Sequence, residues 1–347
     1  MDVILRARAP LRISFAGGGT DVSQYANKYG GAVISTTIDK YAYVSIKETN
    51  SGGITVTSQD YDTVNSINIE DDHKNDETVR LVHAVLKHLN VKNMNLDINT
   101  TVDAIPGSGL GSSSSIVVAL TGAHYKLFNK PFTSYDIANI SYKIERIDCG
   151  IKGGLQDQYS AAFGGFNFIE FNKSSVIVTP LRIKGEILNE LLSSFLLVDT
   201  GQRREHLEYD RIIENQIMQT EQNTHNAIEN LHYIKKLAYE MKDLLLKGDV
   251  KKFGEKLGEG WEHKKAIDAS ISNPKIDQLY QESLNAGSVG GKLLGAGGGG
   301  HLLLFTPIEK RSKVIKAMKK NNATITGFNF DVDGLKTWAV SENGTVL

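Results

Sequence analysis

The sequence predicts a protein of two α+β lobes with a boundary near residue 190. Strand-like segments dominate the first half of the chain, whereas residues from about 205 to 285 carry apolar side chains at helical spacings of three and four. After this helical stretch the pattern returns to short strands. Because 347 residues suffice for one large or two ordinary domains, we expect an N-terminal lobe over residues 1–190 and a C-terminal lobe over residues 191–347.

The strands of the first lobe follow from runs of β-branched and apolar residues bounded by turn residues. We expect them over Val3–Arg8, Ala32–Ile38, Tyr41–Glu48, Ile54–Ser58, Leu96–Val102, Gly164–Phe171 and Ser175–Thr179. Apolar residues at helical spacing predict helices over Thr78–Leu89, Ile116–Phe128 and Ser134–Asp148. Residues 60–77 are polar, and we expect them to be irregular.

The second lobe begins with a short buried strand, Phe195–Val198. A helical stripe runs from Ile213 to Leu245, and polar residues 221–226 predict a break in it. Further helices and strands are expected over Val250–Trp261, Ile276–Leu284, Lys292–Leu294, His301–Phe305, Glu309–Asn321, Phe328–Val332 and Thr337–Val340.

One glycine-rich stretch lies between a predicted strand and a predicted helix. It reads Pro106-Gly-Ser-Gly-Leu-Gly-Ser-Ser-Ser-Ser115. Its glycines allow the backbone amides to approach a ligand closely, and the first N–H groups of a helix have no partner within the helix. Because the helix dipole adds positive charge there, such a place binds phosphate. The serine hydroxyls are candidates to cap the helix, to contact phosphate or to reach Mg²⁺.

This stretch differs from two better-known phosphate-binding patterns. It has no Lys-Ser/Thr at its end, as a P-loop would require. Its third glycine comes one residue too early for a dinucleotide fingerprint, and no early βαβ unit surrounds it. Taken alone it also fits a glycine-rich turn capped by serine. Its interpretation therefore depends on the other motifs of the chain.

Composition excludes several classes of protein. The chain has 39 Lys and Arg against 40 Asp and Glu, a balance that favours neither a nucleic acid nor a membrane surface as partner. The single cysteine, Cys149, cannot form an internal disulfide, and we expect a small core residue there. The N-terminus lacks a signal-peptide pattern and no apolar run has membrane-spanning length, so we expect a cytoplasmic protein.

Three further motifs accompany the phosphate-loop candidate. They are Ala9-Pro-Leu-Arg12 followed by Gly17-Gly-Gly-Thr-Asp21, then Gly153-Gly-Leu-Gln-Asp157, and Lys292-Leu-Leu-Gly-Ala-Gly-Gly-Gly-Gly300. In their order and separation they resemble the galactokinase, homoserine kinase, mevalonate kinase and phosphomevalonate kinase superfamily over almost the whole chain. The Gly153 motif and the ending Phe328–Trp338 resemble the subgroup of D-glycero-D-manno-heptose 7-phosphate kinases. Gly18 and Gly19 stand where galactokinases carry Glu-His, which argues against galactose.

The resemblance implies a fold and a reaction. The N-terminal lobe should resemble the second domain of ribosomal protein S5, and the C-terminal lobe a ferredoxin-like α/β sandwich. The implied reaction is transfer of the γ-phosphoryl group of Mg-ATP to the anomeric hydroxyl of D-glycero-D-manno-heptose 7-phosphate, which supplies activated heptose for surface polysaccharide. The implied ligands are therefore ATP, Mg²⁺ and a sugar phosphate.

The resemblance also assigns roles to residues, each of which has a simpler alternative. Asp157 is the implied catalytic base, or else it caps a helix; Arg12 is its implied cationic partner, or else it forms an ordinary ion pair. Asp21 is implied to contact the sugar, or to cap the helix near residues 22–29. Glu145 and Ser112 are the implied metal ligands, although Glu145 also fits a solvated helix face. Gly297–Gly300 is a site loop or a plain hairpin.

The remaining implied site residues complete the set. The nucleotide is expected at Pro106, Gly107, Ser108, Gly109, Leu110, Gly111, Ser112, Ser113 and Ser114. The substrate is expected at Gly18, Gly19, Thr20, Asp21, Gly154, Gln156, Arg204, Gly297 and Gly298, with Arg203, Lys152 and Lys292 as further candidates for its phosphate.

Two other functions remain open from the sequence. An oxidoreductase would use Gly107–Gly111 for a dinucleotide, but the acidic ribose contact is missing. A sugar sensor that kept the fold without activity is the other, and the presence of both Arg12 and Asp157 argues against it. Related kinases of fucose or other anomeric sugars are the nearest enzymatic alternative.

Overall fold

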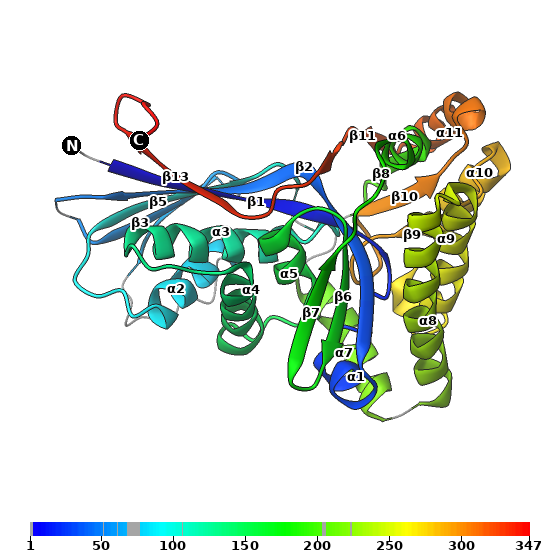
Figure 1. Cartoon of the computed structure of the whole chain (residues 1–347), viewed down its shortest axis with the longest axis horizontal. Coiled ribbons are helices and arrows are strands. Elements are labelled where there is room, and N and C mark those ends of the chain that lie inside the picture. Colours follow the sequence, from blue (N-terminus) through cyan, green and yellow to red (C-terminus); the bar gives the residue numbers. More distant parts are fainter. Residues whose placement is uncertain are drawn as a thin grey trace.

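The computed structural model describes residues 3–50, 52–60, 62–67, 77–105, 107–202, 206–222 and 224–347, and it leaves out the side chains of Glu77 and of residues 206–210. Two sheets organise the chain, a nine-stranded one and a four-stranded one (Figure 1). Among the described residues, no helix combines the length and the apolar character that a bilayer crossing needs.

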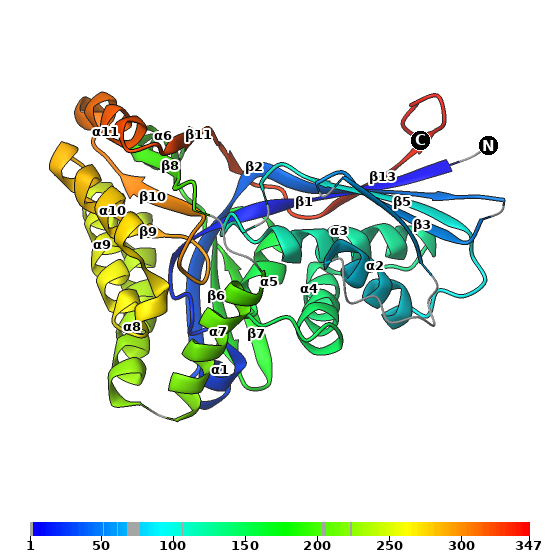
Figure 2. The ribbon, with the colours of Figure 1, turned by 180° about the vertical axis from the view of Figure 1, so that it is seen from behind.

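The first lobe is built on the nine-stranded sheet. Its strands run in the order β13-β1-β2-β5-β3-β4, while β12 and β6 also pair with β2, and β7 pairs with β6. Their bounds are β1 Val3–Ala16, β2 Gly31–Glu48, β3 Ile54–Ser58, β4 Thr63–Ile67, β5 Leu96–Val102, β6 Asn167–Asn172, β7 Ser175–Pro180, β12 Phe330–Asp331 and β13 Lys336–Ser341. The helices are α1 Ser23–Tyr29, α2 Glu77–His88, α3 Ser112–Leu127, α4 Ser134–Tyr142 and α5 Gln156–Phe163, with a π-helix over Lys143–Asp148. Two opposite views place α2, α3 and α4 on the same side of the long sheet (Figures 1 and 2).

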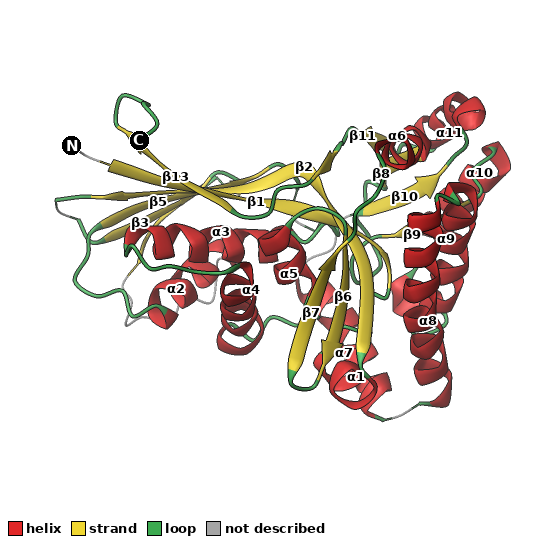
Figure 3. Cartoon of the chain, viewed as in Figure 1, coloured by secondary structure: helices red, strands yellow, loops and turns green. Residues whose placement is uncertain are grey.

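The second lobe is built on the four-stranded antiparallel sheet, in the order β11-β8-β10-β9. Its strands are β8 Phe195–Asp199, β9 Gly290–Leu293, β10 His301–Phe305 and β11 Thr324–Thr326. Its helices are α6 Gly185–Ser194, α7 His206–Glu221, α8 His225–Lys247, α9 Val250–Lys265, α10 Pro274–Ala286 and α11 Ile308–Lys320, with a 3-10 turn over Ala269–Ile271. The colouring by secondary structure shows α8, α9 and α10 grouped at the end of the molecule opposite β13 and β3 (Figure 3).

Most expected elements are confirmed, and the differences have physical causes. The strands expected over residues 32–38 and 41–48 form one continuous strand, β2, and β1 runs through Pro10 to Ala16. A β-bulge follows Pro10 in its pairing with β2, where the missing N–H of proline is tolerated. The expectation of an irregular segment over residues 60–77 is wrong for β4, which has weak periodicity and is held by pairing with β3.

The chain ends on the sheet where it began. β13 pairs with β1 from Val3↔Ser341 to Arg8↔Lys336, and β12 pairs with β2. The boundary expected near residue 190 falls within α6. The division into residues 1–190 and 191–347 stays a prediction.

One apolar core joins the two lobes and determines which way β1 faces. Side chains alternate between the faces of a strand, and Leu11, Ile13 and Phe15 are buried in a cluster that also contains Phe253 of α9 and Leu303 of β10. The intervening polar residues of β1 therefore point to the opposite side, toward the helices of the first lobe. This places polar side chains at the junction of the lobes.

Candidate active site

The phosphate-loop candidate has the backbone geometry that its glycines permit. Gly107, Gly109 and Gly111 all have positive φ, between 75° and 79°, a region that other residues adopt only with strain. α3 begins directly after this loop with Gly111 as its N-cap, so no side chain of the cap residue occupies the first-turn amides. The start of α3 thus keeps the donors that a phosphate needs. Pro106 lies outside the described residues.

The serines that open α3 tie it to its neighbours. The Ser113 hydroxyl donates to Glu145 Oε1 over 2.8 Å, and the Ser115 hydroxyl donates to the Pro10 carbonyl over 2.9 Å. The Ser114 hydroxyl accepts from Gln158 over 3.2 Å. These contacts hold the helix start against β1, α5 and the π-helix, which makes its position rigid.

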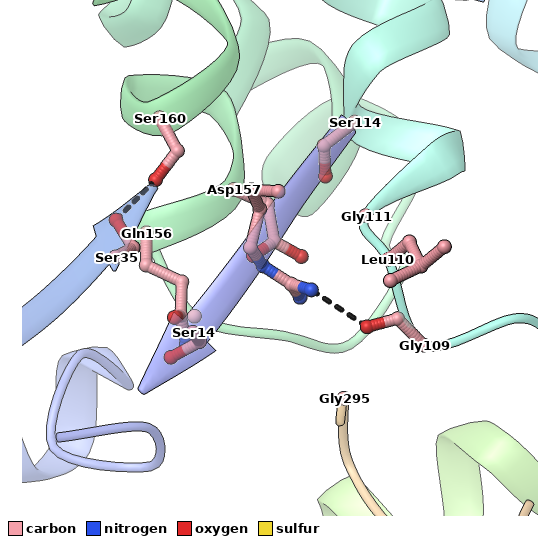
Figure 4. Close-up of polar contacts among 12 residues, drawn as sticks. Ser14, Ser35, Gly109, Leu110, Gly111, Ser114, Gln156, Asp157, Ser160 and Gly295 are labelled. Atoms are coloured by element: carbon pink, nitrogen blue, oxygen red, sulfur yellow. Dashed lines mark hydrogen bonds and ion pairs between the residues drawn. The ribbon is translucent and has the colours of Figure 1, made fainter. Parts of the chain in front are cut away.

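Arg12 and Asp157 meet at this loop although 145 residues separate them in sequence. Arg12 Nε donates to Asp157 Oδ1 over 2.7 Å, and Arg12 Nη1 donates to the Gly109 carbonyl over 2.6 Å. A Cβ atom on Gly111 would lie only 3.5 Å from Asp157 Oδ2. Figure 4 shows the Asp157 side chain facing the Gly109–Gly111 segment. The predicted base and the predicted phosphate loop therefore share one site.

The helix-cap alternatives for the two aspartates are wrong in different ways. Asp157 lies in the first turn of α5 without capping it, since α5 has Leu155 as its N-cap and no capping side chain. Asp21 does not cap α1 either, because the N-cap there is Val22. Instead Asp21 Oδ2 accepts from the Gln156 N–H over 3.1 Å at the start of α5. Burial, and to a smaller extent the nearby Asp157, raise the pKa of Asp21.

The Gly17–Asp21 loop holds Asp21 in place. Asp21 Oδ1 accepts from the Gly19 N–H over 2.9 Å, and a Cβ on Gly154 would lie 2.0 Å from Asp21 Oδ2. Thr20 is fully buried, and its hydroxyl donates to the Gly17 carbonyl over 2.7 Å. Thr20 thus stabilises the loop from its buried side, whereas Gly18 and Gly19 line a cleft.

A cleft of about 580 Å³, part of it open to solvent, lies in front of these residues. It is lined by Arg12, Ser14, Gly18, Gly19, Asp21, Val22, Arg146, Gly153, Gly154, Gln156, Asp157, Ile213, Gln216, Lys264, Lys292, Gly295 and Ala296. Four of these side chains are cationic and two are carboxylates, so the lining carries an excess of positive charge. A cleft of this kind attracts phosphate groups.

Two of the four basic side chains are buried lysines from the second lobe. Lys264 of α9 donates to the Gly295 carbonyl, and Lys292 of β9 donates to the carbonyls of Ser14 and Phe15 over 2.9 and 3.2 Å. Burial, followed by Arg12, lowers the pKa of Lys264 to about 8. Burial, followed by Lys264 and Arg12, lowers the pKa of Lys292 well below its usual value.

Sequence reasoning missed Lys264 and Arg146. Arg146 lies next to the predicted metal ligand Glu145 and donates to Ser114 Oγ over 3.3 Å. Lys264 had a readable signal, because it continues the apolar stripe of α9 three residues after Trp261. A lysine at a core position of an amphipathic helix is unusual and indicates a role for its charge.

The other phosphate candidates lie at different places. Lys152 is half exposed and lies 3.8 Å from Glu214, whereas Lys292 points into the cleft. Arg203 and Arg204 lie outside the described residues.

The last glycine loop touches the phosphate loop directly. A Cβ on Gly295 would lie 2.8 Å from Gly109 Cα, and a Cβ on Gly300 would lie 2.5 Å from the Ser108 carbonyl oxygen. Gly295 and Ala296 line the cleft, whereas Gly297 packs on the Ile271 backbone and the Gly298 N–H donates to the Ile271 carbonyl. Loop 295–300 is therefore part of the site's architecture, and substrate contact by Gly297 and Gly298 stays a prediction.

Glu145 has the chemistry of a magnesium ligand. Its carboxylate is 1% exposed, accepts from Ser113 and from Gln158, and lies 3.2 Å from Arg146. Its solvated-face alternative is therefore wrong. Mg²⁺ is held by one or two protein oxygens plus phosphate and water, and a buried carboxylate beside serine hydroxyls at a phosphate loop fits that donor set. Across the described ranges no group of three or more His, Cys, Asp or Glu residues forms a closed metal site.

Comparison with known proteins agrees with this geometry. Residues 77–165 match the GHMP kinases N terminal domain, and residues 241–324 match the GHMP kinases C terminal. The D-glycero-alpha-D-manno-heptose 7-phosphate kinase of Campylobacter jejuni is 35% identical over 97% of this chain and 99% of its own length. A mevalonate kinase of Pyrococcus abyssi is 27% identical over 99% of this chain and all of its own.

Solved structures share the whole fold. A D-glycero-D-manno-heptose 1-phosphate kinase from Bacteroides thetaiotaomicron superposes with a TM-score of 0.80 at 35% identity, covering 97% of this chain and 100% of the other. A Lactococcus lactis galactokinase with bound galactose, 17% identical, has a TM-score of 0.77 over 96% of this chain and 95% of its own and supports the fold alone. With both domains matched and a full-length relative at this identity, the chain belongs to the GHMP kinase family.

Proposed function

We propose that this kinase transfers the γ-phosphoryl group of ATP to the anomeric hydroxyl of D-glycero-D-manno-heptose 7-phosphate. At the coarser level the chain is an ATP-dependent sugar kinase. The single observation that carries the proposal is the placement of the Arg12–Asp157 pair against the phosphate loop, inside a cleft with an excess of positive charge.

In the proposed mechanism Asp157 takes the proton of the attacking hydroxyl. Asp157 Oδ1 is bound to Arg12, whereas Oδ2 lies toward Gly111 and the start of α3, where the phosphates would bind. As the hydroxyl oxygen bonds to the γ-phosphorus, its proton moves to Oδ2 and ADP leaves. The positive charge of Arg12, held beside the base, would stabilise negative charge on the transferring group.

The buried lysines support recognition of a substrate that carries its own phosphate. A sugar phosphate adds negative charge at the sugar end of the cleft, in addition to the charge of ATP at the α3 end. Lys264 and Lys292 interact electrostatically with Asp21 and Arg12, and they donate to the carbonyls of Gly295, Ser14 and Phe15 rather than to the phosphate loop itself. We therefore assign the substrate phosphate to the Lys264 and Lys292 side, with Arg204 as a further candidate.

Mg²⁺ would be held by Glu145 and a serine hydroxyl at the start of α3. When bound, it would neutralise charge on the phosphate oxygens. Ser112 is the predicted partner of Glu145, and Ser113 is the serine that donates to Glu145. We propose that the product supplies activated heptose for surface polysaccharide. We also propose that the enzyme acts in the cytoplasm.

The test is a phosphorylation assay of the purified chain. Substrates should include heptose 7-phosphate, heptose 1-phosphate, fucose, galactose and mannose, each with Mg-ATP, followed by ³¹P NMR of the product. We expect the highest kcat/KM for heptose 7-phosphate and an anomeric phosphate signal in its product. Preferred use of an unphosphorylated sugar, or of the 1-phosphate named for the Bacteroides relative, would overturn the substrate assignment and leave the kinase assignment intact.

A further inference from the structure

β1 and α5 each present a second polar side chain to the cleft, next to the Arg12–Asp157 pair. Ser14 lies two residues after Arg12 and so shares its face of β1. Gln156 precedes Asp157 in the first turn of α5. All four side chains line the cleft.

Ser14 and Gln156 converge beside Gly18 and lack partners there. A Cβ on Gly18 would lie 3.8 Å from Ser14 Oγ and 3.5 Å from Gln156 Nε2. Ser14 is only 5% exposed, and neither its hydroxyl nor Gln156 Oε1 has a hydrogen-bond partner within the part of the chain that the structure describes. Figure 4 shows the two side chains next to each other near the end of the strand.

Buried polar atoms without partners are rare and costly, and in a substrate cleft they indicate where a ligand completes the hydrogen bonding. A hydroxyl and a carboxamide are neutral, and each both donates and accepts. They therefore match a hydroxyl group, whereas a phosphate is better matched by the basic side chains of the cleft. Gly18 adds room, because it presents no side chain between them.

We propose that Ser14 and Gln156, above Gly18, form a subsite for one hydroxyl of the sugar other than the hydroxyl that is phosphorylated. This inference rests on the proposed sugar kinase function. Two residues along a strand span about 6.6 Å. The recognised hydroxyl is thus displaced along β1 from the Arg12–Asp157 pair, and it belongs to a carbon remote from the reacting one rather than to its neighbour.

The first test compares Ser14→Ala with a matched control, Ser160→Ala. Ser160 is also a buried serine, but its hydroxyl bonds to Ser35 over 3.0 Å, away from the cleft lining (Figure 4). Removing one neutral hydrogen bond should raise the sugar KM about tenfold. We expect this change for Ser14→Ala with little change in the KM for ATP, and an unchanged sugar KM for Ser160→Ala. An unchanged sugar KM for Ser14→Ala would refute the subsite.

The second test uses analogues of the best sugar substrate that lack one ring hydroxyl each. For the analogue without the recognised hydroxyl, wild type and Ser14→Ala should have the same KM, whereas they should differ for the other analogues. If Ser14→Ala raised the KM of every analogue equally, Ser14 would act only on the structure of the site. Because the comparison uses whichever sugar is turned over best, it remains decisive even if heptose 7-phosphate is not the substrate.

A third variant, Gly18→Ala, fills the space without removing a polar group. Its φ is not in the left-handed region, and the new methyl group would have no contact shorter than 3.5 Å, so the fold should tolerate it. We expect a raised sugar KM with unchanged thermal stability. A sugar KM like that of wild type would show that no ligand atom occupies the space and would overturn the proposal.

Discussion

Replacing Lys264 by methionine should make the protein more stable and the enzyme worse. Lys264 is 7% exposed, and its pKa is lowered from 10.5 to about 8. That difference corresponds to about 3 kcal/mol of cost for keeping the ammonium charged in the folded protein. Methionine loses the hydrogen bond to the Gly295 carbonyl, worth about 1 kcal/mol. We therefore expect Lys264→Met to gain about 2 kcal/mol in unfolding free energy near neutral pH.

The gain must disappear at alkaline pH. Below pH 8 both the folded and the unfolded wild type hold the proton on Lys264, and the cost of the buried charge is fully present. Between pH 8 and 10.5 the folded state loses this proton first, so the Lys264 contribution to wild-type stability rises with pH. Above that window the cost is gone, and methionine should then be less stable than lysine by about 1 kcal/mol.

The assay is urea unfolding of wild type and variant at about pH 7 and about pH 10, together with sugar-phosphate kinetics. Lys251→Met is the control, because Lys251 of the same helix is exposed, lies 3.9 Å from Glu255 and should change stability little. If Lys264 binds the substrate phosphate, the KM for the sugar phosphate should rise about tenfold to a hundredfold in Lys264→Met. A variant less stable than wild type near pH 7 would refute the reasoning.

Three other changes probe the site. Asp157→Asn should lower kcat by about 10²–10⁴ with little effect on the KM for ATP, and a kcat near that of wild type would exclude Asp157 as the base. The control Asp277→Asn, in the first turn of α10, should leave kcat unchanged. Gly109→Ala places a methyl group 2.6 Å from the Leu294 carbonyl oxygen at a φ of +78°. The unfolding free energy should therefore fall by at least about 1–2 kcal/mol, and the KM for ATP should rise. An unchanged unfolding free energy in calorimetry and an unchanged KM for ATP would contradict this prediction. Glu145→Gln should raise the Mg²⁺ concentration for half-maximal activity by about tenfold or more, and an identical Mg²⁺ titration would exclude Glu145 as a ligand.

Local features of the fold could be read from the sequence because their causes lie within a few residues. β3 and β5 have the predicted bounds, since short runs of β-branched residues between turn residues determine them. The positive φ of Gly107, Gly109 and Gly111 agrees with a loop that only glycine permits. β4 and α6 were missed, because their periodicity is weak and their neighbours in space hold them in place.

The sequence by itself indicated the GHMP kinase family and predicted the glycine-rich loop before α3, and the resemblance predicted Arg12 and Asp157 as a pair. Only the tertiary structure decided that Asp21 accepts from the Gln156 N–H at the start of α5, that Lys264 and Arg146 line the cleft, and that the Ser14 hydroxyl lacks a partner beside Gln156. The physical reason is that a glycine's φ or a strand's alternation depends on adjacent residues. Burial, charge and unsatisfied hydrogen bonding instead depend on which distant segments meet, and β1, α5 and α9 meet only once both lobes have packed on their shared core.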